Sequence, residues 1–489
     1  MNAAGSQSDT GQHGRIGLVT WNVNGLLPCI KRMGGKSLHE LLEDFGPDVH
    51  IVCLQETKMQ RSQLDQSLAR PEGWDAFYSF CDARNVHHAG YSGTATFVRQ
   101  SSRPVDAQEG FASLCCLADM PRLLQHLELY DIAKGEIEAQ SRSGLDLGSS
   151  TIPDELAGEE ILGKKRPARH LDEAPAEEQQ DAGLFELLSS TTPEHLRALD
   201  SEGRCVCTDH GDFVLLNCYF PAVRSADKFQ FKLDTDRFLF KLRFNIFLHQ
   251  ALARLRSQGR RVVLVGDINI ACERLDSACS DDDPDFDLSL SRVWFGALLK
   301  DQGLVDVFRH FHPKARVYTC WNQQTGARLT NYGTRLDYVL ADKRLIGDKS
   351  GEGVTFADCE IEGHEGSHQR GSDHCPVLAW MELESRAALP SRRWWAAKEA
   401  DGAEVHEEFS REAFSGSKGE REPPAMCATF LPEARSKQTS ITSMFSVQTA
   451  AALKAPTSEG NGGRQKPLRE CHENAWCVAR GDPRLTCHA

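Results

Sequence analysis

The sequence contains no long apolar run. Nowhere do about 18 or more apolar residues follow one another, as a membrane-spanning helix would require. Residues 1–14 are polar and lack the apolar core of a secretory signal peptide. The 17 cysteines are scattered along 489 residues without a framework of close pairs, so we expect reduced thiols in a cytosolic or nuclear protein. These absences argue against a membrane partner and against a small disulfide-stabilised secreted domain.

A positive net charge, which would favour a nucleic-acid partner, is also missing. The chain has 56 Lys and Arg against 70 Asp and Glu, a net charge of −14. Most of the acidic excess lies in residues 131–203, which contain 17 acidic and 7 basic residues. The remainder is close to neutral, so the overall charge does not exclude a DNA-binding surface. We interpret residues 131–203 as a disordered or loosely helical insertion, because they are rich in Ala, Gly and Pro and poor in aromatic residues.

Short apolar strands that alternate with helical segments are what the sequence does contain. Helices are indicated where apolar residues recur at helical spacing, and strands where short apolar runs end in polar residues. The predicted strands are 15–24, 49–54, 93–99, 213–221, 261–266, 334–340 and 372–380, and the predicted helices are 36–43, 236–258 and 294–302. This alternation is typical of an α/β domain, to which we assign residues 15–385. We expect residues 1–14 to be disordered and residues 386–489 to form a mostly disordered tail.

Polar side chains end most of these strands. The most informative stretch is 261–269, where a buried strand ends at Gly266 and is followed by Asp267 and Asn269 on a shared face. A simple turn would also explain these residues. Catalytic groups of α/β proteins, however, lie at the carboxyl ends of strands, and the pattern recurs on independent strands. The residues in question are Asn22, Asn24, Glu56, Tyr219, Asp267, Asn269, Asp337, Asp373 and His374.

These strand-end residues are oxygen donors together with one histidine. Mg²⁺ takes carboxylate and amide oxygens, keeps several waters, and is usually completed by a substrate phosphate. No closely spaced Cys/His set accompanies the residues, so zinc is the less suitable metal here. The set therefore predicts a site for Mg²⁺, with Mn²⁺ as the alternative, and for an attacking water.

Five motifs resemble, in order, those of the exonuclease III-type AP endonucleases, and the wider endonuclease/exonuclease/phosphatase superfamily shares part of them. They read TWNVNGL, LQETK, CYFP, GDIN and RLDYVL…SDHCP. Finer features are similar to the eukaryotic AP endonuclease 2 branch: GYSGTATF at 90–97, TCWNQQTGARLTNYGTRLDYVL at 319–340, the acidic insertion and the long tail. The resemblance covers residues 15–384 except 131–203. It implies a four-layer α/β sandwich, in which two packed mixed sheets carry helices on their outer faces.

The resemblance also implies roles for the matching residues. Those implied to act in catalysis are Tyr219, Asp267, Asn269, Asp337 and His374, those implied to form the metal site are Asn22, Glu56, Asp267, Asn269, Asp373 and His374, and the expected DNA contacts are Asn24, Lys58, Trp321 and Arg335. Asp267 would orient or deprotonate the water, and His374, positioned by Asp337, would contact the scissile phosphate. Tyr219 and Asn269 would stabilise the charged transition state. Whether Asp267 or His374 takes the proton stays open.

Three positions depart from the family pattern. Ala222 follows the Tyr-x-Pro motif where many relatives have Asn or His, Cys320 stands where Phe is frequent, and Thr334 where some have Trp. In the family these positions help to shape the pocket for a flipped-out sugar. A less aromatic pocket keeps incision at abasic sites and predicts a larger share of 3′→5′ exonuclease or 3′-end cleaning.

One motif in the tail and another in the insertion concern partners and location. Residues 438–445 resemble a box that binds a PCNA-like sliding clamp, although Met444 replaces the usual first aromatic residue. Its expected contacts are Gln438, Ile441, Met444 and Phe445. The basic cluster 163–169 is either a nuclear signal or a solvated run of charge, and we expect the protein in the nucleus.

The last residues, 467–489, are similar to the opening of a GRF-type zinc finger. Only 12 residues follow Cys477, too few for the remainder of that finger, and its Gly-Arg-Phe signature is absent. Zinc at this end is therefore not expected, although its Cys and His residues are of a type that binds zinc.

The sequence thus predicts a Mg²⁺-dependent nuclease of base excision repair. It would cut duplex DNA at abasic sites, act as a 3′→5′ exonuclease or 3′-phosphodiesterase, and function as a monomer. One alternative is a superfamily phosphatase acting on small or lipid phosphoesters, which the DNA-type motifs and the clamp box disfavour. The other is an inactive scaffold that binds DNA or the clamp. Such a scaffold predicts the loss of core residues, yet Glu56, Asp267, Asn269, Asp373 and His374 are all present.

Overall fold

The computed structural model describes residues 14–81, 90–119, 124, 188–222, 235–283, 286–347, 354–363, 371–383 and 422–432. The basic cluster 163–169, the clamp-box residues 438–445 and the zinc-finger-like end 467–489 lie outside these ranges, as do residues 1–13. Among the described helices, none combines the length and the apolar character that crossing a membrane requires.

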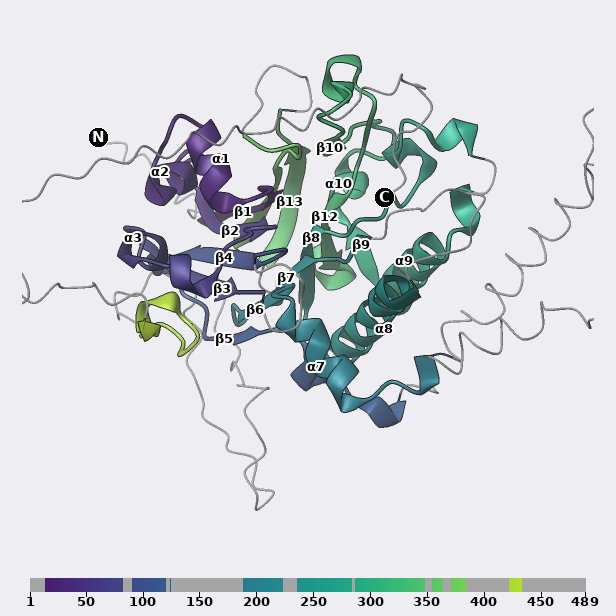
Figure 1. The fold of residues 1–489 in the computed structure, drawn as a ribbon, viewed down its shortest axis with the longest axis horizontal. Coiled ribbons are helices and arrows are strands. Elements are labelled where there is room, and N and C mark those ends of the chain that lie inside the picture. Colours follow the sequence, from purple (N-terminus) through teal and green to yellow (C-terminus); the bar gives the residue numbers. More distant parts are fainter. Residues whose placement is uncertain are drawn as a thin grey trace, which may run out of the picture.

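Two six-stranded mixed sheets form the centre of the molecule (Figure 1). Across sheet A the strands are β13 (Val354–Ile361), β14 (Val377–Leu383), β1 (Gly14–Asn22), β2 (Val49–Gln55), β4 (Thr94–Arg99) and β3 (Trp74–Ser79). Across sheet B they are β5 (Asp106–Glu109), β6 (Cys205–Asp209), β7 (Val214–Tyr219), β8 (Val262–Asp267), β12 (Asp337–Asp342) and β9 (Leu304–Asp306). A small hairpin joins β10 (Cys320–Trp321) to β11 (Gly333–Thr334).

One parallel pair lies near the middle of each sheet. β1 runs parallel to β2, and β7 runs parallel to β8, whereas β12 is antiparallel to β8. The carboxyl ends of β7 and β8 therefore lie at the same edge as the beginning of β12. This arrangement brings Tyr219, Asp267 and Asp337 to one edge, because both Tyr219 and Asp337 pair with Asp267 in the register of the sheet.

Helices cover the outer faces of the two sheets (Figure 1). The α-helices are α1 (Leu26–Arg32), α2 (Leu38–Glu43), α3 (Gln66–Ala69), α7 (Pro193–Ser201), α8 (Thr235–Ser257), α9 (Leu290–Asp301) and α10 (Val307–Phe311). Short 3₁₀ helices are η1 (Arg61–Gln63), η2 (Gln100–Ser102), η3 (Ala112–Leu114), η4 (Leu117–Asp119), η5 (Arg274–Asp276), η6 (Ser280–Asp282), η7 (Phe286–Leu288), η8 (Ala327–Thr330), η9 (Lys343–Leu345) and η10 (Ala428–Phe430). α2 begins with a capping box, in which Ser37 and Glu40 exchange hydrogen bonds at the helix start.

Alternation along the strands separates the inner core from the two outer cores. In β8, Val263 and Val265 belong to the core between the sheets, while Val262 and Leu264 pack with residues of α8 and α9. The same alternation in β1 and β2 directs one set of side chains inward and the other toward α1 and α2. The predicted four-layer α/β sandwich is confirmed.

Several boundaries differ from those read in the sequence. The predicted strand 334–340 is two elements, because Arg335 and Leu336 leave the β10–β11 hairpin before β12 begins, and the Arg335 N–H bonds Asp276 O at 2.7 Å. Strands β3, β5, β6, β9 and β13 were not predicted at all. In β13 exposed positions interrupt the apolar run, and β6 directly follows the acidic segment, so neither carries the continuous apolar signal of β8.

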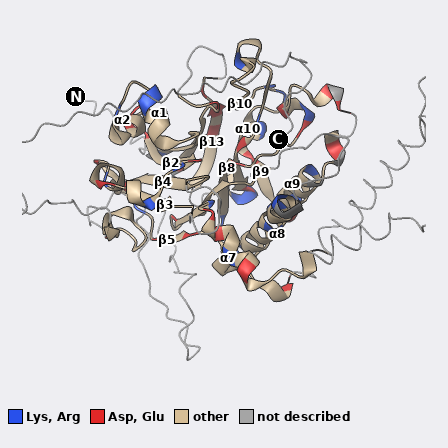
Figure 2. Ribbon diagram, viewed as in Figure 1, with Lys and Arg blue, Asp and Glu red and all other residues tan. Residues whose placement is uncertain are grey.

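Parts of the insertion, predicted to be disordered or loosely helical, and of the tail, predicted to be mostly disordered, are packed on the domain. Within 131–203, α7 forms at Pro193–Ser201 and buries Leu199 in the core outside sheet B. Within the tail, residues 422–432 lie along β3 and α3, with Cys427 and Ala428 fully buried. Basic and acidic residues are interspersed along the described elements (Figure 2), in agreement with the near-neutral charge expected outside the acidic segment.

Candidate active site

The polar strand ends meet where the two sheets adjoin. Asn22 at the end of β1 donates from its amide nitrogen to Asp267 Oδ2 at 2.8 Å and to Glu56 Oε1 at 3.3 Å. One side chain of sheet A thus joins a carboxylate after β2 to a carboxylate at the end of β8. Behind it, Gln55 donates to Asn217 Oδ1 at 2.8 Å, and Asn217 donates to Ala95 O at 2.9 Å. This buried polar bridge fixes the two sheets relative to each other near the site.

Asp267 is a buried carboxylate held by three donor groups from two residues, Asn22 and Asn269. Besides Asn22, the backbone N–H of Asn269 donates to its Oδ1 at 2.9 Å. Only 1% of Asp267 is exposed. This burial raises the pKa of Asp267 to about 7, an effect that nearby His374 counteracts and the Asp337 carboxylate reinforces. The result is a carboxyl group that titrates near neutral pH.

His374 forms a pair with Asp337. Its Nδ1 lies 2.7 Å from Asp337 Oδ2, and its Nε2 lies 4.0 Å from Asp267 Oδ2. Burial alone would lower the pKa of His374, but the Asp337 carboxylate and the Cys320 side chain together outweigh it and raise that pKa well above its ordinary value. Its backbone is also fixed, since Trp21 Nε1 donates to His374 O at 3.1 Å and His374 N donates to Ser372 Oγ at 3.2 Å. The imidazole is therefore held in place, in surroundings that favour its protonated form.

Glu56 collects three donors at the other side of Asn22. The Tyr219 hydroxyl donates to Glu56 Oε1, and Lys58 Nζ lies 2.8 Å from Oε2. Burial alone would raise the pKa of Glu56, but the Lys58 ammonium, the Tyr219 hydroxyl and nearby His374 together outweigh it, and the pKa is lowered. Glu56 therefore stays ionised.

Asp373 is the remaining carboxylate of the predicted set, and it is half-buried. Asn24 Nδ2 donates to Asp373 Oδ1 at 3.0 Å, while Asn24 Oδ1 accepts from Lys58 Nζ. Asn24 and Lys58 thus connect Asp373 to Glu56. The structure brings together all nine strand-end residues that the sequence singled out.

Backbone strain marks the same residues. Five described non-glycine residues have positive φ: Asn24 (47°), Glu56 (48°), Lys58 (51°), Asn269 (54°) and Asn331 (50°). The first four contribute to the hydrogen-bonded set just described. Left-handed conformations of such residues are unfavourable and cluster where a fold holds side chains for function. No sequence pattern predicts these positive φ values, although Asn adopts the left-handed conformation more readily than most residues.

The donor set fits a divalent cation. Donor atoms of Asp267, Asp337 and His374 lie within 4.8 Å of one another. His374 Nδ1 already binds Asp337, however, so Glu56 and Asp373 are the carboxylates better suited as ligands. Hard oxygen ligands of this kind suit Mg²⁺, Mn²⁺ or Ca²⁺ rather than zinc. Asn22 and Asn269 direct their amide nitrogens to Asp267, so a metal contact by either residue would have to come from its amide oxygen.

Two expected DNA contacts have other surroundings. Arg335 is 1% exposed and binds Asp276 at 2.8 Å and Asp306 at 2.7 Å, so its guanidinium does not reach a phosphate. Trp321 is 2% exposed beneath Arg328; its backbone N–H donates to Asp373 O at 3.2 Å, and its indole N–H donates to Asn331 Oδ1 at 3.2 Å. Both predictions of direct contact are corrected: Arg335 pairs with two buried carboxylates, and Trp321 holds the backbone of Asp373. Lys58 and Asn24 remain at its rim, with 38% of the Lys58 side chain exposed.

Residues that sequence reasoning missed lie behind the site. Lys241 of α8 is buried, and its Nζ donates to Asn269 O at 3.2 Å. Burial lowers the pKa of Lys241 to about 8, partly offset by Asp267. Arg204, before β6, donates to Tyr219 O at 3.0 Å. In the sequence, Lys241 is only a charged residue within a largely apolar helix, and Arg204 is only a charged residue before a strand. Such residues are too common to identify a site.

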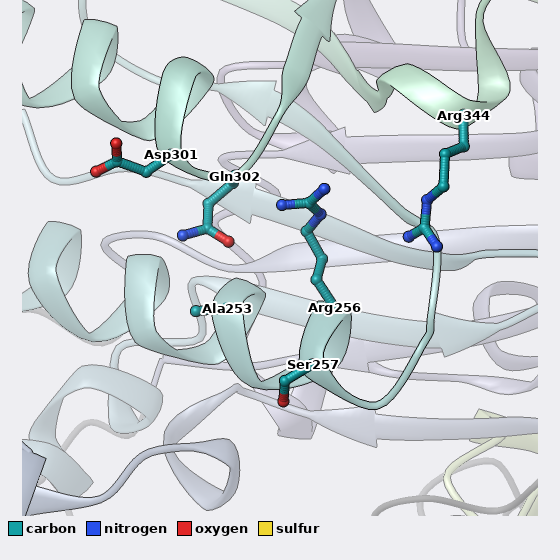
Figure 3. Close-up of a pocket in the computed structure, with 6 residues that line it drawn as sticks. All are labelled: Ala253, Arg256, Ser257, Asp301, Gln302 and Arg344. Carbon is teal, nitrogen blue, oxygen red and sulfur yellow. The ribbon is translucent and has the colours of Figure 1, made fainter.

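A polar pocket of about 460 Å³ lies elsewhere and is not this site (Figure 3). Its lining residues are Ala253, Arg256, Ser257, Asp301, Gln302 and Arg344. Arg256 and Arg344 both bind Asp342, which ends the strand that Asp337 begins. A six-residue strand is roughly 17 Å long, so this pocket opens near the opposite end of sheet B.

The residues of this site lie in a part of the chain that matches a known protein family. A model of the endonuclease/exonuclease/phosphatase family matches residues 19–136 and 157–374, which include every strand-end residue named above. The chain belongs to the endonuclease/exonuclease/phosphatase family. The shared part of this family therefore coincides with the sandwich and its polar edge.

Curated relatives and a solved structure narrow the likeness. DNA-(apurinic or apyrimidinic site) endonuclease 2 from Mus musculus is 27% identical over 448 residues, covering 85% of this chain and 63% of the relative. The protein of the same name from Homo sapiens is 29% identical over 401 residues, covering 75% and 60%. This chain thus spans 60–63% of the length of these relatives. The crystal structure of the Xenopus laevis APE2 catalytic domain is similar with a TM-score of 0.55 and 26% identity, covering 86% of this chain and 99% of that one.

Proposed function

We propose that this protein is a DNA-repair hydrolase that uses Mg²⁺, or Mn²⁺ in its place, to cleave phosphodiester bonds at abasic sites and at damaged 3′ ends. The observation that carries the proposal is the buried Asp267 beside the His374–Asp337 pair, adjoining Glu56. The relatives named AP endonuclease 2 support DNA as the substrate.

The environments of Asp267 and His374 suit opposite roles. With a pKa raised by burial to about 7, Asp267 can accept a proton from an attacking water near neutral pH. His374, whose pKa is raised by Asp337, can donate from Nε2 to a phosphate oxygen. The 4.0 Å between His374 Nε2 and Asp267 Oδ2 is too long for a direct hydrogen bond, so each group can act on the substrate. The sequence left open whether Asp267 or His374 takes the proton. We therefore assign the role of general base to Asp267.

The remaining residues would handle charge. A divalent cation held by Glu56 and Asp373 would neutralise charge on the phosphate oxygens and on the leaving 3′ oxygen. Tyr219 orients Glu56 through its hydroxyl. Asn269 is fixed by Phe220 O at 2.9 Å and by Asp267. Both lie where they could stabilise charge that develops in the transition state.

The substrate preference is proposed from the wall beside His374. Cys320 pairs with Thr334 in the β10–β11 hairpin, and Cys320 also forms a β-bridge with His374. Two of the three family departures therefore stand together next to the residue that would contact the phosphate. A wall without aromatic rings offers less stacking surface to a flipped-out sugar. This supports 3′→5′ exonuclease or 3′-phosphodiesterase activity as a large share of the total.

Cleavage of end-labelled duplexes tests the function. One duplex carries a central abasic analogue and another a 3′ mismatch, each with and without Mg²⁺. The wild type is compared with Asp267→Ala and with Asp281→Ala, a control in which a carboxylate of 70% side-chain exposure is removed from the surface. We expect metal-dependent cleavage by the wild type and the control, and a loss of roughly 10³-fold or more in Asp267→Ala.

Other outcomes identify the alternatives. Absence of metal-dependent cleavage would support a DNA-binding scaffold, and cleavage of small phosphoesters but not DNA would support a phosphatase. Incision of the abasic duplex far faster than removal of the mismatched nucleotide would contradict the proposed 3′-end preference. We further propose a nuclear location, a monomeric state, and binding of a PCNA-like clamp through residues 438–445, which rest on the sequence alone.

A further inference from the structure

Arg204 is a buried cation with no part in the chemistry proposed above. It precedes β6, and only 1% of it is exposed. Burying a guanidinium is costly, and an ion pair in such a place is often no more stable than apolar packing of the same volume. Stability alone is therefore a weak reason for a charged residue here. Its contacts indicate another reason.

Arg204 binds Tyr219 in three ways. Tyr219 N donates to Arg204 O at 2.9 Å, and Arg204 Nη1 donates to Tyr219 O at 3.0 Å. The guanidinium carbon also lies 4.7 Å from the centre of the Tyr219 ring. Both backbone groups and the ring of Tyr219 are thus fixed by one residue. The free end of that ring carries the hydroxyl that donates to Glu56.

Glu202 holds Arg204 in this position. Arg204 Nε donates to Glu202 Oε2 at 2.6 Å, and Arg237 Nη1 of α8 donates to Glu202 Oε1 at 2.6 Å. The backbone carbonyl of Glu202 accepts from Ser92, whose own carbonyl accepts from Lys58 N at 2.8 Å. The Arg204 side chain therefore supports Glu56 through Tyr219, while the Glu202 backbone is tied separately to Lys58 through Ser92.

We propose that Arg204, anchored by Glu202, is a positioning residue that orients Tyr219 toward Glu56. Glu202 caps α7, so the end of the acidic segment 131–203 supports the site rather than forming a detached insertion. The proposal rests on the proposed phosphodiester hydrolysis and adds the residues that hold its metal-side carboxylate. Gly203 permits the close approach, because its φ is 67° and a Cβ there would lie 2.5 Å from Phe80 C.

A double-mutant cycle tests the proposal on the 3′-mismatch duplex. The proteins are wild type, Arg204→Met, Tyr219→Phe and the double variant. We expect Arg204→Met to lower kcat about 10–100-fold with little change in KM, as loss of a group that orients a metal ligand does. The double variant should be no less active than Tyr219→Phe within about twofold, because Arg204 acts through the Tyr219 hydroxyl. If the fold-losses in kcat of the two single variants multiply in the double variant, the proposal is overturned.

Controls separate this result from misfolding and from failure of the proposed function. Arg197→Met removes an arginine of 69% side-chain exposure from α7, the helix that Glu202 caps, and should leave kcat unchanged. Melting temperatures are measured for every variant. If Arg204→Met does not fold, Glu202→Gln carries the same cycle with Tyr219→Phe, since it loosens the anchor at constant volume, and additivity there would equally refute the role. An inactive wild type would refute the proposed function instead.

Discussion

At the scale of single residues, the site depends on one position that has no side chain. Gly266 precedes Asp267 in β8, with φ at 132°, and a Cβ there would lie 1.8 Å from Cys218 O on the neighbouring strand. An alanine would have to push β7 and β8 apart. Those two strands carry Tyr219 and Asp267. The glycine in the Gly-Asp motif is thus required by close strand packing, and it controls where both functional side chains lie.

Gly266→Ala is expected to lower both stability and activity. The clash and the positive φ together should cost about 2–4 kcal/mol of unfolding free energy, and cleavage should fall by more than the loss of folded protein explains. Chemical denaturation followed by assays on the folded fraction measures both. Gly259→Ala is the matched control, because its φ is 79° and nothing lies within 4 Å of the added Cβ. It should cost only about 1 kcal/mol and leave cleavage intact. Equal effects of the two substitutions would contradict the argument.

At the scale of elements, the sequence predicted strand ends well and their supports poorly. Asp267 and Asn269 stood out because a continuous apolar run ended there, and β8 is buried along its whole length. Arg335 gave the opposite result. It follows Thr334 in the same motif, yet it turns into the protein and binds two carboxylates. The period of two in a strand predicts which face of the sheet a side chain is on. It does not predict which distant residue forms an ion pair with that side chain, as Asp276 does with Arg335.

Arg335→Met distinguishes the buried role from the DNA contact that was first expected. Removing the guanidinium leaves the carboxylates of Asp276 and Asp306 partly unpaired, so we expect a loss of about 3–5 kcal/mol in unfolding free energy. Lys58→Met is the contrast. Because 38% of that side chain is exposed and Glu56 keeps the Asn22 and Tyr219 donors, the loss of stability should be smaller than that of Arg335→Met, while cleavage falls. Urea titrations and DNA-binding isotherms of both variants decide the matter. Weakened DNA binding by a fully stable Arg335→Met would restore the original expectation.

At the scale of the whole molecule, the site exists only when both sheets are in place. Asn22 comes from sheet A and Asp267 from sheet B, and they are joined by a hydrogen bond of 2.8 Å between residues far apart in the chain. An α/β domain could be predicted because apolar strands and amphipathic helices alternate, whereas the four-layer arrangement was implied by the resemblance to the family. Residues 422–432 could not be predicted to cover β3, since Cys427 and Ala428 make an apolar patch too short to be read as an element. The site therefore forms only when the whole domain folds.

Global stability should depend on pH through buried histidines, and His249 of α8 allows a clean measurement. Burial lowers its pKa to about 4 from an ordinary value of 6.5, partly offset by Asp301. Between about pH 6.5 and pH 4, His249 is therefore protonated in the unfolded chain but neutral in the folded protein. Because the unfolded state binds the additional proton, the contribution of His249 lowers the free energy of unfolding as pH falls through this range. The raised pKa of Asp200, about 6, acts in the opposite direction, so the total curve mixes both. His249→Gln removes one contribution. Its stability relative to wild type should improve by about 2 kcal/mol between pH 7 and pH 5. Parallel curves for the two proteins in denaturant titrations at these pH values would show that His249 is not held neutral by the fold.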